Sequence, residues 1–231
     1  MLAASLAQAV GSLLPVAVAV AISPIPIIAV VVILGTPRAR VNGLAFAAGW
    51  VVGLAAVATV VLVLTGASGA DDPTSSSATG VNWVQVTLGV ALLALAARQW
   101  RGRPGPGEPT ELPEWMEKVD RFGPGASAGA GLVLSAANPK NLVLAISAGA
   151  TIGQAGLAAG QDVVAIAAFV VIGSLTVVGA VLYSLVDRRG SASVLASVKA
   201  FMATHNAAIM TVLLGVIGAK VLGQGVGGAW G

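Results

Sequence analysis

Six apolar runs divide this 231-residue chain, and each is close to the length that crosses a bilayer. The hydrocarbon core of a membrane is about 30 Å thick, so a helix needs roughly 20 apolar residues to span it. The chain is 57% hydrophobic and only 9% charged, which is typical of a polytopic membrane protein. We therefore predict an all-α membrane protein with spans at about 6–34, 43–65, 81–97, 127–150, 162–186 and 205–222.

The distribution of basic residues predicts the orientation of these spans. Ten of the twelve Lys and Arg residues fall in segments after the first, third and fifth spans, while the opposite loops contain only acidic charges. Loops rich in Lys and Arg stay in the cytoplasm. We therefore expect a multi-pass protein of a bacterial cytoplasmic (inner) membrane with both termini outside. Arg38 is the first basic residue, so the sequence has no charged region of the kind that opens a cleavable signal peptide.

The composition also excludes several kinds of chemistry. The chain has no cysteine and one histidine, so thiol redox chemistry, disulfides and multi-histidine metal sites are excluded. Outside the loops the sequence offers neither an acid pair nor a nucleophile with a base. We accordingly expect no enzyme activity, no metal, no cofactor and no nucleic-acid partner.

The first and fourth spans each contain a predicted helix break. Ser23-Pro24-Ile25-Pro26 removes two backbone donors, and Asn138-Pro139 places a good N-cap residue before a proline. Each break lies twelve residues from the cytoplasmic end of its span, or roughly 18 Å at 1.5 Å per residue. The two breaks are therefore predicted to lie at equal depth, near the middle of the membrane.

Two opposed breaks predict a repeated architecture. We expect a first three-helix repeat at 1–97, a cytoplasmic linker at 98–125 and a second three-helix repeat at 126–231, with inverted topology and broken helices 1 and 4. In inverted-repeat transporters the binding site forms where such broken helices meet, and restarted half-helices direct their positive ends toward it. A single proline kink is usually structural, so the matched pair is what favours function.

Lys140 lies beside the second break, and no acidic residue lies in the core of any predicted span. A lysine at the centre of a membrane helix costs about 2.5–3.5 kcal/mol on insertion scales. We expect an anionic ligand to offset this cost, with Ser23, Asn138 and Asn141 orienting it and Pro24, Pro26 and Pro139 keeping the helices broken. Alternatively, Lys140 snorkels to the interface or is deprotonated.

The linker contains a predicted amphipathic helix. Leu112, Trp115, Met116, Val119 and Phe122 recur at helical spacing, opposite a charged face. One interpretation is a helix in the inner membrane interface, anchored by Trp115 and Met116. The other is a helix that caps the bundle through ordinary packing.

Four segments in this order resemble the LysE superfamily of exporters, and most closely its GAP or Sap (peptidoglycolipid addressing) branch. They are the segments 23–28, 38–50, 112–116 and 138–142, which include Ser23-Pro24-Ile25-Pro26, Gly49-Trp50, Leu112-Pro113-Glu114-Trp115-Met116 and Asn138-Pro139-Lys140-Asn141. The resemblance implies a six-span exporter with two inverted three-helix repeats. It also implies that the substrate is a cell-envelope glycolipid.

Three functions follow as hypotheses. The first is a flippase or exporter that moves an anionic lipid or glycolipid from the cytoplasmic leaflet outward, with membrane lipids around it and Lys140 as head-group counter-ion. The second is an exporter of small polar solutes such as amino acids or anions. The third is a non-transporting adaptor that acts with envelope-synthesis proteins through the helix around Trp115. A homodimer is compatible with each.

Overall fold

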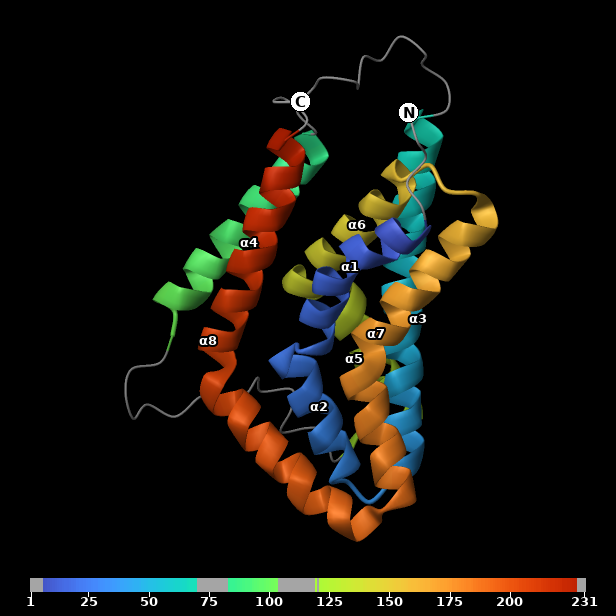
Figure 1. Cartoon of the computed structure of the whole chain (residues 1–231). Coiled ribbons are helices and arrows are strands. Elements are labelled where there is room, and N and C mark those ends of the chain that lie inside the picture. The colour runs from blue at the N-terminus through green and yellow to red at the C-terminus, as the bar shows by residue number, and fades with distance from the viewer. Residues whose placement is uncertain (1–5, 70–82, 104–118, 120, 228–231) are drawn as a thin grey trace.

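A computed structural model describes residues 6–69, 83–103, 119 and 121–227, and these residues form helices and connecting turns without any strand. The described helices, in chain order, are α1 (Leu6–Ala21), α2 (Pro24–Leu34), α3 (Ala39–Gly69), α4 (Trp83–Arg101), α5 (Pro124–Ala136), α6 (Pro139–Gln154), α7 (Ala159–Val186) and α8 (Arg188–Gly227). They pack as an elongated bundle, as Figure 1 shows. The predicted all-α fold class is confirmed for this part of the chain.

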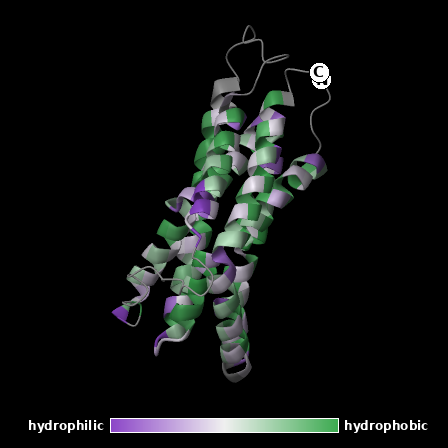
Figure 2. Cartoon of the chain, turned by 90° about the vertical axis from the view of Figure 1, so that its left-hand side faces the viewer, coloured by the Kyte–Doolittle hydropathy of each residue, from purple (hydrophilic) through white to green (hydrophobic). Residues whose placement is uncertain are grey.

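Three helices are each long and apolar enough to cross a membrane: α3, α7 and α8. The consecutive helices α1 and α2 are bent by 51° at their break and qualify together as a fourth span. Hydrophobic and neutral residues make up most of the length of the helices, as expected for helices that span a membrane (Figure 2). The chain is therefore a helical membrane protein. The prediction of six spans stays open, because α4 and the pair α5 and α6 do not qualify in the same way.

Both predicted helix breaks are present. Ser23 and Asn138 have extended backbone angles, with ψ of 113° and 121°, and each is followed by a proline that begins the next helix. Proline has a fixed φ and no N–H, so it fits the first turn of a helix but cannot continue one. The local sequence therefore explains why the first and fourth apolar runs are each interrupted.

Glycines set the distance between the long helix α3 and its neighbours α5 and α6. A Cβ atom on Gly49 would overlap the backbone of Ala128 in α5, and one on Gly149 would lie 2.5 Å from the Ala58 carbonyl oxygen in α3. Small residues four apart let two membrane helices approach closely. Elsewhere in the bundle α1 packs against α7, and α4 runs along α8.

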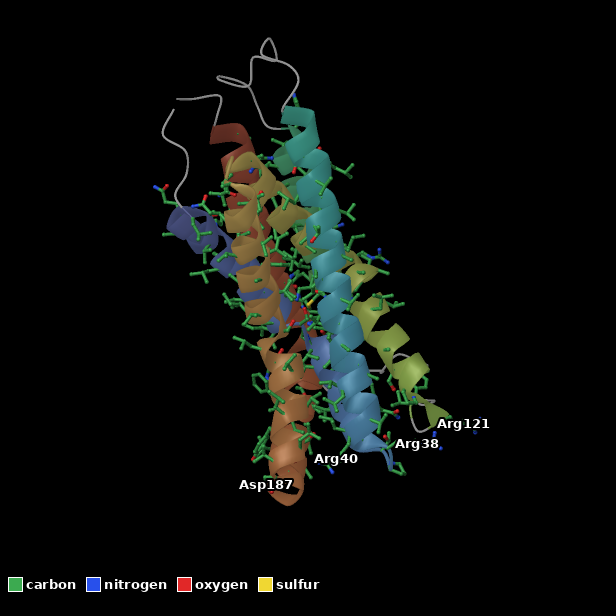
Figure 3. The ribbon with its side chains drawn as sticks, turned by 90° about the vertical axis from the view of Figure 1, so that its right-hand side faces the viewer. Arg38, Arg40, Arg121 and Asp187 are labelled. Atoms are coloured by element: carbon green, nitrogen blue, oxygen red, sulfur yellow. The ribbon has the colours of Figure 1, made fainter. Side chains whose placement is uncertain are left out.

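Several charged residues lie at one end of the bundle. The labelled residues Arg38, Arg40, Arg121 and Asp187 lie at the lower end (Figure 3), whereas α8 ends near the top (Figure 1).

Two helices depart from the predicted spans. α8 is continuous from Arg188, well before the expected start at 205, and its first part crosses the lower end. α4 ends at about mid-height, well above the lower end (Figure 1).

Candidate functional site

Lys140 joins the two helix breaks. Its amino group donates hydrogen bonds to the Ala19 carbonyl oxygen in α1, at 2.9 Å, and to Ser23 Oγ, at 2.7 Å. The side chain is only 4% exposed and is directed into the bundle. The alternative in which Lys140 snorkels to the interface is therefore wrong. The structure instead places the lysine at the point where the break between α1 and α2 meets the start of α6.

The hydrogen bond to Ala19 follows from the prolines that end α1. In a continuous helix the Ala19 carbonyl would accept the Ser23 N–H, but that N–H turns to Val20 instead, at 3.1 Å. Lys140 supplies the missing donor, and the carbonyl end of α1 carries a partial negative charge that favours a cation. Neutral protein oxygens therefore offset part of the cost of burying Lys140. The expectation that an anionic ligand also offsets this cost stays a prediction.

Asn141 supplies the missing hydrogen-bond donor at the end of α5. Its Nδ2 donates to the Leu134 carbonyl oxygen at 2.9 Å, because the Asn138 N–H that would normally bond there turns to Val133. Its Oδ1 accepts a hydrogen bond from Ser23 Oγ at 2.8 Å. Asn141 is 1% exposed and Ser23 is 2% exposed. One buried network thus connects the two breaks.

The other predicted site residues have more local roles. Asn138 is half-buried and caps α6, since its Oδ1 accepts the Lys140 backbone N–H at 3.1 Å. Pro24 and Pro26 are buried and Pro139 is exposed. Trp115 and Met116, the predicted interfacial anchors, lie outside the described residues. Val119, from the same segment, is buried in the hydrophobic core.

A cavity of about 440 Å³ lies beside this network, and we call it the Lys140 cavity. Lys140, Asn138 and Pro139 line one side. Residues of α2, α4 and α8 and the turn after α4 line the rest, namely Ile25, Leu95, Arg98, Gln99, Gly102, Met210 and Leu214. No acidic side chain is among these residues. Two cationic residues therefore line a space without an acidic residue in its described wall.

Arg98 is the residue that sequence reasoning missed. It was assigned to a cytoplasmic loop, but it lies in the last turn of α4 and lines the Lys140 cavity. The signal that could have found it was the shortness of the predicted span 81–97. A short helix whose neighbours are longer can end beside the middle of the bundle.

The starts of α2 and α6 provide fewer backbone donors than expected. Pro24 and Pro26 have no N–H, so only Ile25 among the first three residues of α2 can donate. At the start of α6, Pro139 has none and the Lys140 N–H is used by the Asn138 side chain. An anion in this cavity would therefore depend mainly on side-chain cations.

Comparison with known proteins gives one positive result. No curated protein and no solved structure matches the chain. The family model described as Sap, sulfolipid-1-addressing protein, matches residues 13–227, which include the network and the cavity. This match concerns the Sap branch, and the wider relationship to LysE exporters stays a prediction. Because the match covers nearly the whole sequence, the chain belongs to the Sap, sulfolipid-1-addressing protein family.

Proposed function

We propose that this chain is a flippase or exporter that moves an anionic lipid from the cytoplasmic leaflet outward, with the head group held between Lys140 and Arg98. The Lys140 cavity carries this proposal, because both cations line it and its described wall has no acidic residue. The family description names a sulfolipid, whose sulfate is an anionic group of the required kind. Sulfate and phosphate both suit paired cationic donors.

The hydrogen bonds of Lys140 leave room for a ligand. An ammonium group has three N–H donors, and among the described residues only Ala19 and Ser23 accept from it. The third donor is available to an anion in the cavity. Arg98 is not covered by other parts of the chain, so its guanidinium is accessible to the same anion.

A small anion is the second candidate substrate, and the size of the cavity favours it. A volume of about 440 Å³ is within the range of small-molecule pockets, roughly 300–1,000 Å³. A lipid would place only its head group there, with its tails outside along apolar surface. An amino acid would need an acidic partner for its ammonium, and the described lining residues include none.

We also propose that the chain is a six-span inverted repeat in which α1–α4 correspond to α5–α8. In such a repeat, the packing of α1 on α7 would have its counterpart in the packing of α5 on α3, and both pairs are in contact. The two breaks would correspond to each other, as would α4 and α8. Alternating access in this class comes from the movement of one repeat against the other. The lower end, which carries Arg38 and Arg40, would face the cytoplasm.

A lipid-scrambling assay tests the transport proposal. The full chain is reconstituted into phosphatidylcholine vesicles that contain fluorescent phosphatidylglycerol or fluorescent phosphatidylcholine, and the movement between leaflets is followed by chemical quenching. We expect faster movement of the anionic lipid. Lys140→Met and Arg98→Gln should each remove that preference, and Lys140→Arg should retain part of it because the charge remains.

Lys220→Met is the matched control. Lys220 is a half-buried lysine in the apolar helix α8, but it donates to the Ser12 carbonyl oxygen at 2.9 Å and does not line the cavity. This variant should keep the preference for the anionic lipid. Normal transport by Lys140→Met would contradict the proposal. Movement of radiolabelled sulfate with no movement of lipid would favour the small-anion exporter instead.

A further inference from the structure

A second cavity lies at the lower end of the bundle, away from the helix breaks, and we call it the Arg40 cavity. It has a volume of about 340 Å³ and lies between the end of α2, the start of α3, the end of α7 and the first part of α8. Its lining includes Val31, Gly35, Arg40, Ser184, Ser191 and Lys199. None of these residues lines the Lys140 cavity. The two spaces are therefore separate.

The polar groups of the Arg40 cavity match an anion. Arg40 and Lys199 come from α3 and α8, and no acidic residue is among the described residues that line the cavity. Ser191, at the start of α8, also lines the cavity and is 2% exposed as a whole residue. Its hydroxyl is a neutral donor that can supplement the two cations. Ser184, by contrast, already donates to the Val181 carbonyl at 2.7 Å.

Two groups near the cavity disfavour an anion. The carbonyl end of α2 at Gly35 carries about half a negative charge. The Asp187 carboxylate caps the start of α8 by accepting the Gly190 N–H at 2.8 Å, and it does not line the cavity. Two full positive charges therefore exceed the negative charge that borders this space.

We propose that the Arg40 cavity binds the phosphate or sulfate of an anionic head group at the inner membrane surface, before the lipid reaches Lys140. The surrounding wall is apolar on the α2 side, where Val31, Val32 and Leu34 could contact the first part of an acyl chain. Basic pockets between membrane helices on the cytoplasmic side typically bind anionic head groups. The direction of loading rests on the proposed function, whereas binding to the cavity does not.

Binding is tested with the full chain in phosphatidylcholine nanodiscs. Short-chain phosphatidylglycerol, short-chain phosphatidylcholine and inorganic phosphate are titrated by calorimetry. We expect phosphatidylglycerol to bind and phosphatidylcholine not to bind. Arg40→Gln and Lys199→Gln should each weaken binding about fivefold, which is typical of one cation near a membrane surface. Ser191→Ala should weaken binding about threefold. Each of the three variants should keep the elution volume and helical content of the wild type, which would show that the loss of binding does not come from misfolding.

Arg38→Gln is the matched control, because Arg38 lies at the same end (Figure 3) but does not line the cavity. It should leave binding unchanged, and Lys199→Arg should largely retain it. Equal weakening by Arg38→Gln would overturn the proposal, because the attraction would then be a diffuse surface effect. Phosphate binding as tight as that of the lipid would overturn the assignment to a lipid head group. Absence of any binding would overturn the site itself.

Lys140→Met separates this inference from the transport proposal. The variant should bind short-chain phosphatidylglycerol at the Arg40 cavity as the wild type does, while it loses the transport preference. Normal transport with intact binding would contradict only the transport proposal. Loss of binding in Lys140→Met would contradict the independence of the two sites and, with it, this inference.

Discussion

Replacement of Asn141 by leucine should lower the free energy of unfolding by more than the loss of a single hydrogen bond would. Asn141 makes two hydrogen bonds to other parts of the chain, one to the Leu134 carbonyl and one from Ser23 Oγ. Leucine has a similar length but no polar atom. The change therefore removes both bonds and leaves the Leu134 carbonyl without its side-chain donor at the end of α5.

The magnitude follows from these contacts. Hydrogen bonds between membrane helices contribute about 0.6 kcal/mol each on average, so the two bonds account for about 1.2 kcal/mol. A buried carbonyl left without a partner costs about 1–3 kcal/mol more. We expect the free energy of unfolding to fall by about 2–4 kcal/mol.

The measurement is reversible unfolding in mixed micelles of dodecyl sulfate and a mild detergent, followed by circular dichroism. Thr151→Val is the control in the same helix, because the Thr151 hydroxyl bonds only to the Ser147 carbonyl of α6 itself, at 2.8 Å. It should change stability by about 0.5 kcal/mol or less, as expected for a side chain that bonds its own helix. A double-mutant cycle with Ser23→Ala should give a coupling energy of about 0.5–1 kcal/mol.

Two results would refute this reasoning. If Asn141→Leu is no more destabilising than Thr151→Val, the network does not satisfy the end of α5 in the way described. If the effects of Asn141→Leu and Ser23→Ala are additive, the two residues do not interact energetically. In either case Asn141 would not be an energetic link between the two breaks, and Lys140 alone would connect them through its bonds to Ala19 and Ser23.

Three further predictions use the same unfolding assay. Gly149→Ala should destabilise by about 1–3 kcal/mol, because its Cβ would lie 2.5 Å from the Ala58 carbonyl oxygen, whereas Gly129→Ala has no atom within 4 Å and should stabilise by about 0.5–1 kcal/mol. Thr176→Val removes the hydroxyl that bonds the Ala21 carbonyl at the end of α1 and should cost about 1–2 kcal/mol. Lys220→Met should lower the free energy of unfolding by about 1 kcal/mol or less, because the Ser12 carbonyl can still accept its hydrogen bond within α1. A larger decrease would show that Lys220 holds α8 to α1.

The helix breaks could be predicted from sequence because their cause is local. Pro24 and Pro26 remove donors from their own helix, and Asn138 caps the helix that Pro139 begins. Equal spacing from the charged ends predicted that both breaks lie at one depth. The hydrogen bond between Lys140 and Ser23 is consistent with that prediction.

The partners of Lys140 could not be predicted in the same way. Ala19 lies 121 positions earlier in the chain, and the local sequence does not indicate which side chain will bond its carbonyl. The place of Arg98 depends on how α4 packs along α8, which the sequence does not show. The charge pattern used to orient the spans assigns every basic residue after an apolar run to a loop, so it could not place Arg98 beside the cavity. Long-range packing decided both features.

The hydrogen bonds at the breaks also determine how the two halves depend on each other. Lipid offers no donors, so each free carbonyl at a break must find a partner within the protein. The carbonyls at the end of α1 are satisfied by Lys140 and Thr176 of the second half, and Ser23 of the first half bonds Asn141 of the second.

Each broken helix thus supports the other, and a half expressed alone would lose the partners of Ala19 and Ala21. A ligand that draws Lys140 away from Ala19 would remove one of these supports and weaken the connection between the halves. If the proposed anion site is correct, anion binding and the geometry of the break between α1 and α2 would be linked through the Lys140 amino group.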